Sequence, residues 1–342
     1  MQVTLKDIAE QSGFSVTTVS RALGGYDDVS AQTRTHILKI ASELGYQPNQ
    51  IARQLRSQQT RTIGLIIPAA SSGLEDDFFG LLLKGVTHAA TRQHYDVLVS
   101  AQFSEKDEMD AYYRIVGGRR VDGVILARTY RDDPRIDYLR SIDHPFVVSG
   151  RASLDQKTDF PYIDADSRYG VRSLVEHLAS YGHQHIGLIL SPESIVFTSY
   201  RFDGYREGLA NAGLAFDPAY VATGDLSEES GRHAAETLLA RAPRLTAIVA
   251  CNDLMALGAM AAIKARGLTV GDGVAIGGFD DIPLARHADP PLTTVRQPIY
   301  EIGEQLADML IHIIANEPLK MLGRLLKPRL IVRASSGSPR NG

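Results

Sequence analysis

Residues 63–68 of this chain read Ile-Gly-Leu-Ile-Ile-Pro, a continuous apolar run that is typical of a strand buried on both faces of a parallel sheet. From this run onward, short apolar segments alternate with helical segments of about 10–15 residues, which is the pattern of βαβ units. The sequence therefore predicts an α/β body with parallel sheets. Further strands are expected at residues 97–99, 124–126, 146–148, 186–190, 247–250 and 274–279.

Helices are expected between these strands, and the whole scheme runs twice along the chain. Their predicted positions are near residues 78–93, 108–116, 135–142, 169–180, 202–212, 230–240 and 255–264. Two successive open α/β lobes bring the carboxyl ends of their strands to a shared cleft, where sheets of this kind bind ligands. We therefore expect a ligand site between two lobes.

The composition is that of an ordinary folded protein, because 44% of the residues are hydrophobic and 22% are charged. No apolar run reaches the roughly 18 residues of a membrane span, and the chain lacks the basic-then-apolar start of a secretory signal. The only cysteine, Cys251, is expected to be a small buried hydrophobe. These features predict a cytoplasmic protein without disulfides.

The first sixty residues differ in character from the rest. The net charge of −4 argues against nucleic-acid binding for the chain as a whole, but residues 1–62 hold seven basic and only five acidic side chains. Three short helices are predicted here, each starting at a hydroxyl cap (Thr4, Ser15 or Ser30) and ending at glycine. Two short helices separated by a glycine turn and followed by a third are typical of a helix-turn-helix unit.

The second of these helices holds the candidate base-reading residues. Arginine pairs bidentately with guanine in the major groove, and threonine or valine contacts a thymine methyl group. The hydroxyls at the three helix starts are placed to dock phosphates. A small helical domain with a solvated polar face is the alternative. The candidate DNA contacts are Thr4, Ser15, Val16, Thr17, Thr18, Ser20, Arg21 and Ser30.

Residues 49–57 are expected to form a short basic helix that leads into a polar linker. About nine residues is below the roughly 12–15 that an isolated helix needs in water. Ala52 and Leu55 have no obvious core to join, and a leucine wedged into a bent minor groove would explain them. The alternative is a plain spacer between domains. The candidate DNA contacts in this segment are Asn49, Ala52, Arg53 and Leu55.

Polar residues at strand ends of the α/β body are the candidate ligand contacts. A carboxylate, an amide and a planar guanidinium suit the vicinal hydroxyls of a sugar, and an aromatic ring after the first strand suits its face. For each candidate residue taken singly, an exposed group at a strand end is an alternative explanation. The candidates are Phe78, Phe79, Arg128, Arg151, Arg201, which is placed just before a helix, Asn252 and Asp280.

Other chemistry finds little support in the sequence. His183 and His185 have no third metal ligand at a useful spacing, so a loop before a strand is the simpler interpretation. Asp253 and Asp281 are expected to cap helices or hold loops. No nucleophile elbow, P-loop or dinucleotide fingerprint occurs. We therefore predict no cofactor, no metal and no enzymatic activity.

Several stretches of the chain together resemble the LacI–GalR family of bacterial transcription regulators. They are TLKDIA at 4–9, SVTTVSRAL at 15–23, VS at 29–30, TR at 33–34 and GYQPN at 45–49. The resemblance covers nearly the whole chain. It implies a small all-α helix-turn-helix DNA-binding head and an α/β core of the periplasmic-binding-protein type I architecture with two doubly wound parallel-sheet lobes.

The resemblance also implies roles for individual residues. Val16, Thr17 and Arg21 would read bases, and Leu55 would enter the minor groove from a hinge helix that orders on operator DNA. Ligand roles are implied for Arg201, Asn252 and Asp280, and less firmly for Phe79.

The predicted organisation has five parts. They are a helix-turn-helix domain at 1–47, a hinge helix and linker at 48–61, an N-terminal lobe at 62–163 and 294–322, a C-terminal lobe at 164–293 and 323–338, and a polar tail at 339–342. The three crossings between lobes implied by the resemblance thus fall near residues 164, 294 and 323.

The predicted function is that of a ligand-responsive repressor of carbohydrate genes. It would bind a palindromic operator as a homodimer, respond to a mono- or disaccharide and have no membrane partner. The resemblance is to the alpha-glucoside-responsive members of the family. Three alternatives remain: a purine or other metabolite as the effector, a soluble sugar sensor without operator binding, and an enzyme acting in the cleft.

Overall fold

The first compact unit of the chain is Met1–Gln59, and its described residues contain three helices. They are α1 (Leu5–Ser12), α2 (Val16–Leu23) and α3 (Ala31–Glu43). Ile8, Val19 and Ile37, one from each helix, are fully buried together. Because each helix has only a few turns, this shared apolar face rather than helix propensity stabilises the unit. The computed structural model describes residues 3–46, 59–67, 77–102 and 104–339.

The predicted caps of these helices are confirmed. The hydroxyls of Ser15 and Ser30 accept hydrogen bonds from backbone N–H groups three residues on. At Thr4 the carboxylate of Asp7 accepts from the backbone N–H at 2.7 Å and from the hydroxyl at 2.9 Å. Gly13 ends α1 with a φ of 72°, a left-handed conformation that glycine adopts without strain.

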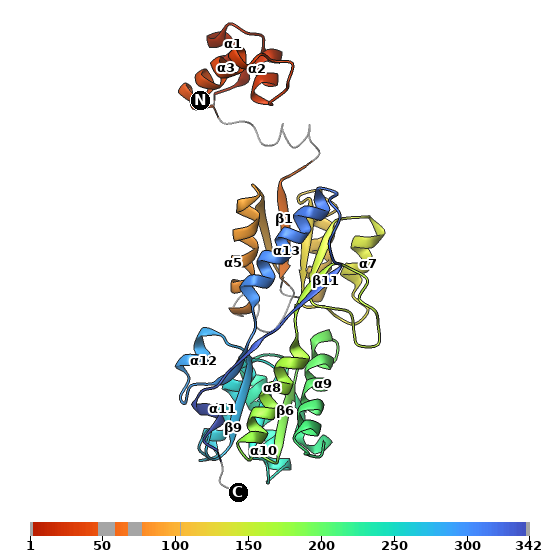
Figure 1. The fold of residues 1–342 in the computed structure, drawn as a ribbon, viewed down its shortest axis with the longest axis vertical. Coiled ribbons are helices and arrows are strands. Elements are labelled where there is room, and N and C mark those ends of the chain that lie inside the picture. Colours follow the sequence, from red (N-terminus) through yellow and green to blue (C-terminus); the bar gives the residue numbers. More distant parts are fainter. Residues whose placement is uncertain (1–2, 47–58, 68–76, 103, 340–342) are drawn as a thin grey trace. The chain divides into compact units, whose positions relative to one another are not determined.

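The second unit, Thr60–Gly342, contains two six-stranded sheets, as predicted for a two-lobed α/β body (Figure 1). The first sheet is parallel throughout and has the order β11 (Gly323–Leu326), β5 (Tyr162–Ala165), β4 (Phe146–Ser149), β3 (Gly123–Ala127), β1 (Thr62–Ile67), β2 (Asp96–Ala101). The second has the order β12 (Arg329–Ile331), β10 (Thr293–Arg296), β9 (Ala275–Asp280), β8 (Ala247–Ala250), β6 (Ile186–Leu190), β7 (Val221–Thr223). Only the pairing of β12 with β10 is antiparallel in the second sheet.

Helices cover the faces of both sheets. The first lobe holds α5 (Asp77–Arg92), α6 (Glu105–Ile115), α7 (Pro134–Ser141) and α13 (Ile299–Ile314). The second lobe holds α8 (Ser167–Ser180), α9 (Val196–Asn211), α10 (Glu228–Arg241), α11 (Asp253–Ala265) and α12 (Pro283–His287), with short 3₁₀ turns η2 (Pro218–Tyr220) and η3 (Ala334–Ser336). Each sheet has an apolar core on both of its faces, which explains its continuous apolar strands.

Helices α5 and α13 pack closely enough to require glycine. A Cβ atom on Gly85 would lie 2.1 Å from the carbonyl oxygen of Tyr300, and one on Gly303 would lie 2.4 Å from that of Leu82. This contact joins α13, a late part of the chain, to the first lobe.

Two of the three predicted crossings between lobes lie later in the chain than expected. Residues 294–296 belong to β10, which pairs with β9 of the second lobe, and residues 323–326 form β11, which pairs with β5 of the first. Both short strands carry polar residues and lack the long apolar run by which the other strands were recognised. The crossings therefore follow Arg296 and Leu326.

Helix α9 also differs from expectation. It begins at Val196, not near residue 202, so Arg201 lies within its second turn and not before it. The stretch before 202 contains β-branched and aromatic residues of modest helix propensity, which packing in the lobe overrides. Among the described residues, no helix is both long and apolar enough to cross a bilayer.

Candidate functional site

Helix α2 of the head presents an exposed edge with the chemistry of base recognition. Val16, at its start, is 41% exposed, and Thr17 and Arg21 lie one turn apart on the same exposed side. The Arg21 guanidinium pairs with the carboxylate of Asp28 and lies 5.1 Å from the centre of the Tyr26 ring. Because this ion pair is exposed, it is worth little and is easily exchanged for another partner.

Thr18 and Ser20, which are also candidate DNA contacts, are only partly exposed. Both are half-buried because they lie next to Val19, which, like Ala22, is buried in the core of the head. The Thr18 hydroxyl also hydrogen-bonds to the Ser15 hydroxyl at 2.9 Å, so it belongs to the cap of α2.

The three predicted phosphate-docking hydroxyls lie at exposed helix starts. Thr4 donates to Asp7, and these hydrogen bonds hold the pKa of that carboxyl below its usual range. A phosphate at α1 would therefore meet a carboxylate, whereas Ser15 and Ser30 lie at helix N-termini whose first turns hold no acidic residue. The predicted contacts Asn49, Ala52, Arg53 and Leu55 lie outside the described residues.

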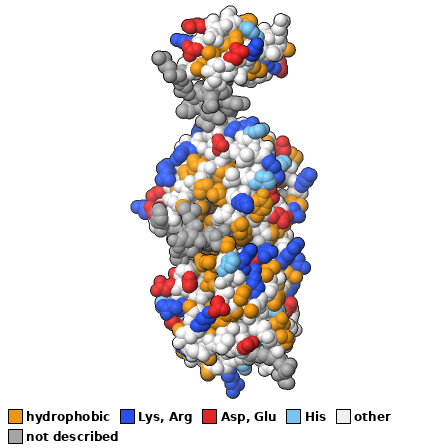
Figure 2. All heavy atoms as spheres, turned by 90° about the vertical axis from the view of Figure 1, so that its left-hand side faces the viewer, with side chains coloured by type: hydrophobic (Ala, Val, Ile, Leu, Met, Phe, Trp, Pro, Cys, Tyr) orange, Lys and Arg blue, Asp and Glu red, His pale blue; other side chains and the backbone are white. Residues whose placement is uncertain are grey.

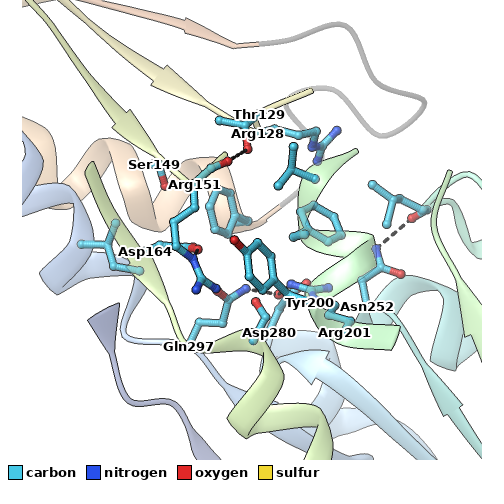
Figure 3. Close-up of a pocket in the computed structure, with 17 residues that line it drawn as sticks. Arg128, Thr129, Ser149, Arg151, Asp164, Tyr200, Arg201, Asn252, Asp280 and Gln297 are labelled. Atoms are coloured by element: carbon cyan, nitrogen blue, oxygen red, sulfur yellow. Dashed lines mark hydrogen bonds and ion pairs between the residues drawn. The ribbon is translucent and has the colours of Figure 1, made fainter. Parts of the chain in front are cut away.

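A cavity between the two lobes of the core is the second candidate site (Figure 3). It encloses about 60 Å³ and is in part open to solvent. Arg128 follows β3, Arg151 follows β4 and Asp280 ends β9, so strand ends of both sheets supply its walls. Its polar and aromatic lining includes Phe78, Arg128, Thr129, Ser149, Arg151, Asp164, Phe197, Tyr200, Arg201, Asn252, Asp280 and Gln297.

Six of the seven predicted ligand residues therefore line one cavity, and Phe79 does not. Phe79 is 1% exposed in the core of the first lobe, where its ring packs edge-on against that of Phe78 at 5.3 Å. Neighbouring residues of a helix point about 100° apart, so only one of the two rings can face the cleft. In this structure Phe79 therefore lies in the core of the first lobe and not on the wall of the cavity.

Arg201 is fixed by its own lobe. Its guanidinium lies between the rings of Phe197 and Phe279, at 4.2 and 3.9 Å from their centres, and donates to the carbonyl of Cys251. Its Nη2 is 4.0 Å from Oδ1 of Asp280. The flat, buried guanidinium is thus held ready for an oxygen ligand.

Asp280 occupies a backbone conformation that is unusual for a residue with a side chain. Its φ is 126°, and that of the next residue, Asp281, is 60°. Gln297 donates a hydrogen bond to the Asp280 carboxylate from the segment that crosses between lobes. Such strain persists only where the surroundings enforce it, and it is frequent at ligand sites.

Asn252 has a structural role as well as a place in the cavity. Its Oδ1 caps α11 by accepting from the N–H of Met255 at 3.0 Å, and its Nδ2 donates to the carbonyl of Leu226 at 2.9 Å. Only one amide N–H is left for a ligand. The neighbouring carboxylates hold loops, as predicted: Asp253 accepts from the N–H of Ile282, and Asp281 pairs with Arg296 and Arg333.

Arg151 is held from both lobes. Its Nε donates to Asp164 at 2.8 Å within the first lobe, and its guanidinium lies 3.7 Å from the centre of the Tyr200 ring of the second. Burial raises the pKa of Asp164, and the charge of Arg151 opposes that rise. Arg128 follows β3 in a left-handed conformation with φ of 61° and lies over the Phe79 ring.

Several lining residues were not predicted. Asp164 lies in a short strand and Phe197 and Tyr200 in a helical turn that the sequence did not reveal, and Gln297 lies in a crossing segment. Thr129 and Ser149 stand next to predicted strand ends, so a search of every strand end for polar groups would have found them.

Comparison with known proteins agrees with this geometry. Residues 4–49 match the model of bacterial regulatory proteins of the lacI family, and residues 60–324 match that of periplasmic binding proteins and the sugar binding domain of the LacI family. The HTH-type transcriptional regulator CelR of Thermobifida fusca is 34% identical over 335 residues, 97% of this chain and 98% of CelR. The regulator AglR of Rhizobium meliloti is 35% identical over 340 residues, 98% of this chain and 95% of AglR.

Solved structures show the same relationship. A complex of the regulator CelR with cellobiose has a TM-score of 0.77 and 33% identity, covering 98% of this chain and 100% of that one. A lac repressor dimer bound to operator and the anti-inducer ONPF has a TM-score of 0.85 and 29% identity, covering 99% and 100%. The head, the two-lobed core and the cleft between the lobes are thus those of a known class, and the chain belongs to the LacI family of bacterial regulatory proteins.

Proposed function

We propose that this protein is a repressor of carbohydrate-utilisation genes whose operator binding is controlled by a small sugar in the cleft. The observation that carries the proposal is the cleft itself, in which guanidinium, carboxylate and amide groups from both lobes surround aromatic rings. This combination binds vicinal hydroxyls and the apolar face of a sugar. The cellobiose bound by the similar regulator CelR supports a mono- or disaccharide.

The head supplies sequence recognition in this proposal. Val16, Thr17 and Arg21 read base edges in the major groove, Ser15 and Ser30 dock phosphates, and the segment 48–61 acts as the hinge. A sugar that binds the closed and open lobes differently would change operator affinity, with a coupling free energy of about 1–3 kcal/mol.

The working form is a cytoplasmic homodimer on a palindromic operator, without catalytic activity. The operator-bound lac repressor dimer supports this assembly. In addition, Leu81 of α5 and Val99 of the edge strand β2 are exposed, and hydrophobic side chains gather on the side of the first lobe where α5 lies (Figure 2). Light scattering of the purified protein should give twice the mass of 37.3 kDa.

Operator recognition is tested by Arg21→Ala. Binding to DNA from upstream of the protein's own gene, measured by fluorescence anisotropy, should lose about 1–3 kcal/mol of preference over scrambled DNA. Lys39→Ala on α3, an exposed residue with the same charge change, is the control and should keep that preference. Equal discrimination by wild type and Arg21→Ala would reject base reading by this residue.

The effector class is tested by calorimetry with cellobiose, maltose, sucrose, glucose, guanine and cytidine. At least one sugar should bind with a stoichiometry of one per chain and change operator affinity. If only guanine or cytidine binds, the effector is a purine or pyrimidine compound and not a sugar. Sugar binding by a protein that never prefers its own upstream DNA would identify a sensor instead of a repressor.

A further inference from the structure

The two lobes also contact each other at a place away from the three segments that connect them. The residues after β3 form an isolated antiparallel bridge with those before α9, pairing Tyr130 with Ile195. The N–H of Arg131 donates to the carbonyl of Ser194 at 3.0 Å, and the N–H of Val196 donates to the carbonyl of Thr129 at 3.0 Å. Two backbone hydrogen bonds therefore join the lobes at the edge of the cleft.

The donor of one of these hydrogen bonds is the backbone N–H at the N-terminus of α9. Val196 is the first residue of α9, and the N–H groups of a first helical turn have no acceptor within their own helix. The carbonyl of Thr129, in the other lobe, takes that place. Val196 is 2% exposed and its side chain lines the cavity, so the contact is sealed from bulk water.

Tyr200, one turn further along α9, makes a further contact between the lobes. Its hydroxyl donates to the carbonyl of Ala152 at 2.9 Å, and its ring lies against the Arg151 guanidinium, as Figure 3 shows. Residues four apart on a helix share one face, so Val196 and Tyr200 present a single surface to the first lobe. We call these two residues the interlobe clamp.

The clamp determines which N–H groups of Arg151 are available to donate to a ligand. Asp164 accepts from Nε, and the Tyr200 ring sets the plane of the guanidinium. The buried Nη2 has no hydrogen-bond partner among the described residues, although Arg151 lines the cavity. A buried N–H that lacks an acceptor is costly, and a guanidinium can only donate. An effector oxygen at this point would remove that cost.

We propose that the interlobe clamp sets effector affinity, because closing it orients Arg151 toward an acceptor oxygen of the effector, a hydroxyl or a ring oxygen. The proposal rests on the proposed function in one respect, namely that the cleft holds an effector. Arg151 makes the contact, while Tyr200 and Val196 are positioning residues. In the open form water would solvate the same N–H, so occupancy of the cleft and closure of the clamp favour each other.

The clamp geometry is tested without any sugar. Opposed residues of an antiparallel pair have Cα atoms about 4.5–5.5 Å apart, which suits a disulfide. Tyr130→Cys combined with Ile195→Cys, in a Cys251→Ala background, should form an intramolecular cross-link visible on a non-reducing gel. The control pair, Tyr130→Cys with Phe216→Cys, should not. Failure of the first pair to cross-link in a folded protein would overturn the clamp.

The cross-linked protein also reports coupling to DNA. Locking the lobes should change operator affinity about 5- to 150-fold relative to the same variant after reduction. Identical operator affinity of the locked and reduced forms would overturn the control of DNA binding by the clamp. The proposed function would then still stand if the wild-type protein prefers its operator and responds to a sugar.

Two variants remove one hydrogen bond each and leave the rest of the clamp in place. Val196→Pro deletes the N–H and replaces the isopropyl group by the proline ring. Proline fits the first position of a helix, and Ile195, with φ of −87° and ψ of 123°, already has a conformation suited to precede it. Tyr200→Phe deletes the hydroxyl and keeps the ring on Arg151. Each should weaken binding of the sugar identified by calorimetry about 2- to 12-fold.

The controls separate positioning from general stability. Val196→Ala keeps the N–H and should bind the sugar more tightly than Val196→Pro, and Tyr200→Leu, which loses ring and hydroxyl, should bind more weakly than Tyr200→Phe. Melting temperatures of the sugar-free variants should stay near that of wild type. Equal affinities within each pair, or losses that follow only the melting temperature, would overturn the positioning roles.

Discussion

The two lobes hold their cleft residues by different means. In the first lobe, Arg135 is 2% exposed and forms ion pairs with Glu108 and Asp133. It also donates to the carbonyls of Ala127 and Arg128, so one buried guanidinium fixes the strand end that carries a cleft residue. In this way the left-handed backbone of Arg128 is maintained.

The second lobe relies on several smaller contacts. Aromatic rings enclose Arg201, and the amide of Asn252 caps a helix and binds a neighbouring loop. The buried carboxylate of Asp281, next to Asp280, does pair with Arg296 and Arg333, but both of these partners are partly exposed, unlike the buried partners of Arg135. The difference predicts that removing Arg135 should damage folding of the first lobe, whereas removing Arg201 should damage ligand binding more than folding.

The largest expected effect is that of Arg135→Ala. Removing one partner of a buried ion cluster leaves uncompensated charge on Glu108 and Asp133, which typically costs about 3–5 kcal/mol. Urea unfolding followed by far-ultraviolet circular dichroism is the measurement, because the chain has no tryptophan. The first lobe should unfold at lower urea than in wild type.

Arg140→Ala is the matched control for this variant, since Arg140 lies on the same helix and pairs with Asp159 at the surface. Exposed ion pairs contribute about 1 kcal/mol or less. If both variants unfold at the urea concentration of wild type, the buried cluster does not hold the first lobe.

The next effect in size is that of Arg201→Ala on ligand binding. Loss of a charged hydrogen-bond donor should cost about 1.5–3 kcal/mol, which weakens the sugar Kd about 10- to 150-fold, while unfolding changes less than in Arg135→Ala. Titration calorimetry measures the Kd. Arg206→Ala is the control, because Arg206 lies on the same helix and stacks on Phe202 and Phe216 outside the cavity. A normal sugar dose response of Arg201→Ala would contradict its assignment.

The elements with a strong apolar signal could be predicted from the sequence, and the short polar ones could not. The run at 63–68 predicted a strand buried on both faces of a parallel sheet, because it has no polar position. By contrast, β10 and β11 are strands only because they pair in register with the neighbouring strands β9 and β5. This is a tertiary effect that the local sequence does not contain.

The candidate site shows the same division. Arg128, Arg151 and Asp280 were predicted since they follow or end recognisable strands. Tyr200 was not, because its role depends on a first-lobe carbonyl and guanidinium far away in sequence. The sequence could not show which of Phe78 and Phe79 faces the cavity and which faces the core, because that depends on where α5 begins.

The smallest expected effect concerns a buried carboxyl of the second lobe. Burial raises the pKa of Asp253 to about 6; hydrogen bonds from the Thr294 hydroxyl and the Ile282 N–H oppose the rise, and the charge of Asp281 adds to it. The folded protein therefore binds a proton between pH 4 and 6 that the unfolded chain releases. Stability from this group is present at low pH and is lost as the pH rises through about 6.

Asp253→Asn removes this titration and so isolates it from other carboxyls. The free energy of unfolding of wild type, minus that of the variant, should fall by about 1 kcal/mol between pH 5 and pH 7. A constant offset from the altered hydrogen bonds does not affect this slope, so urea titrations at both pH values suffice. A difference that stays flat, or rises with pH, would mean that Asp253 is ionised throughout this pH range.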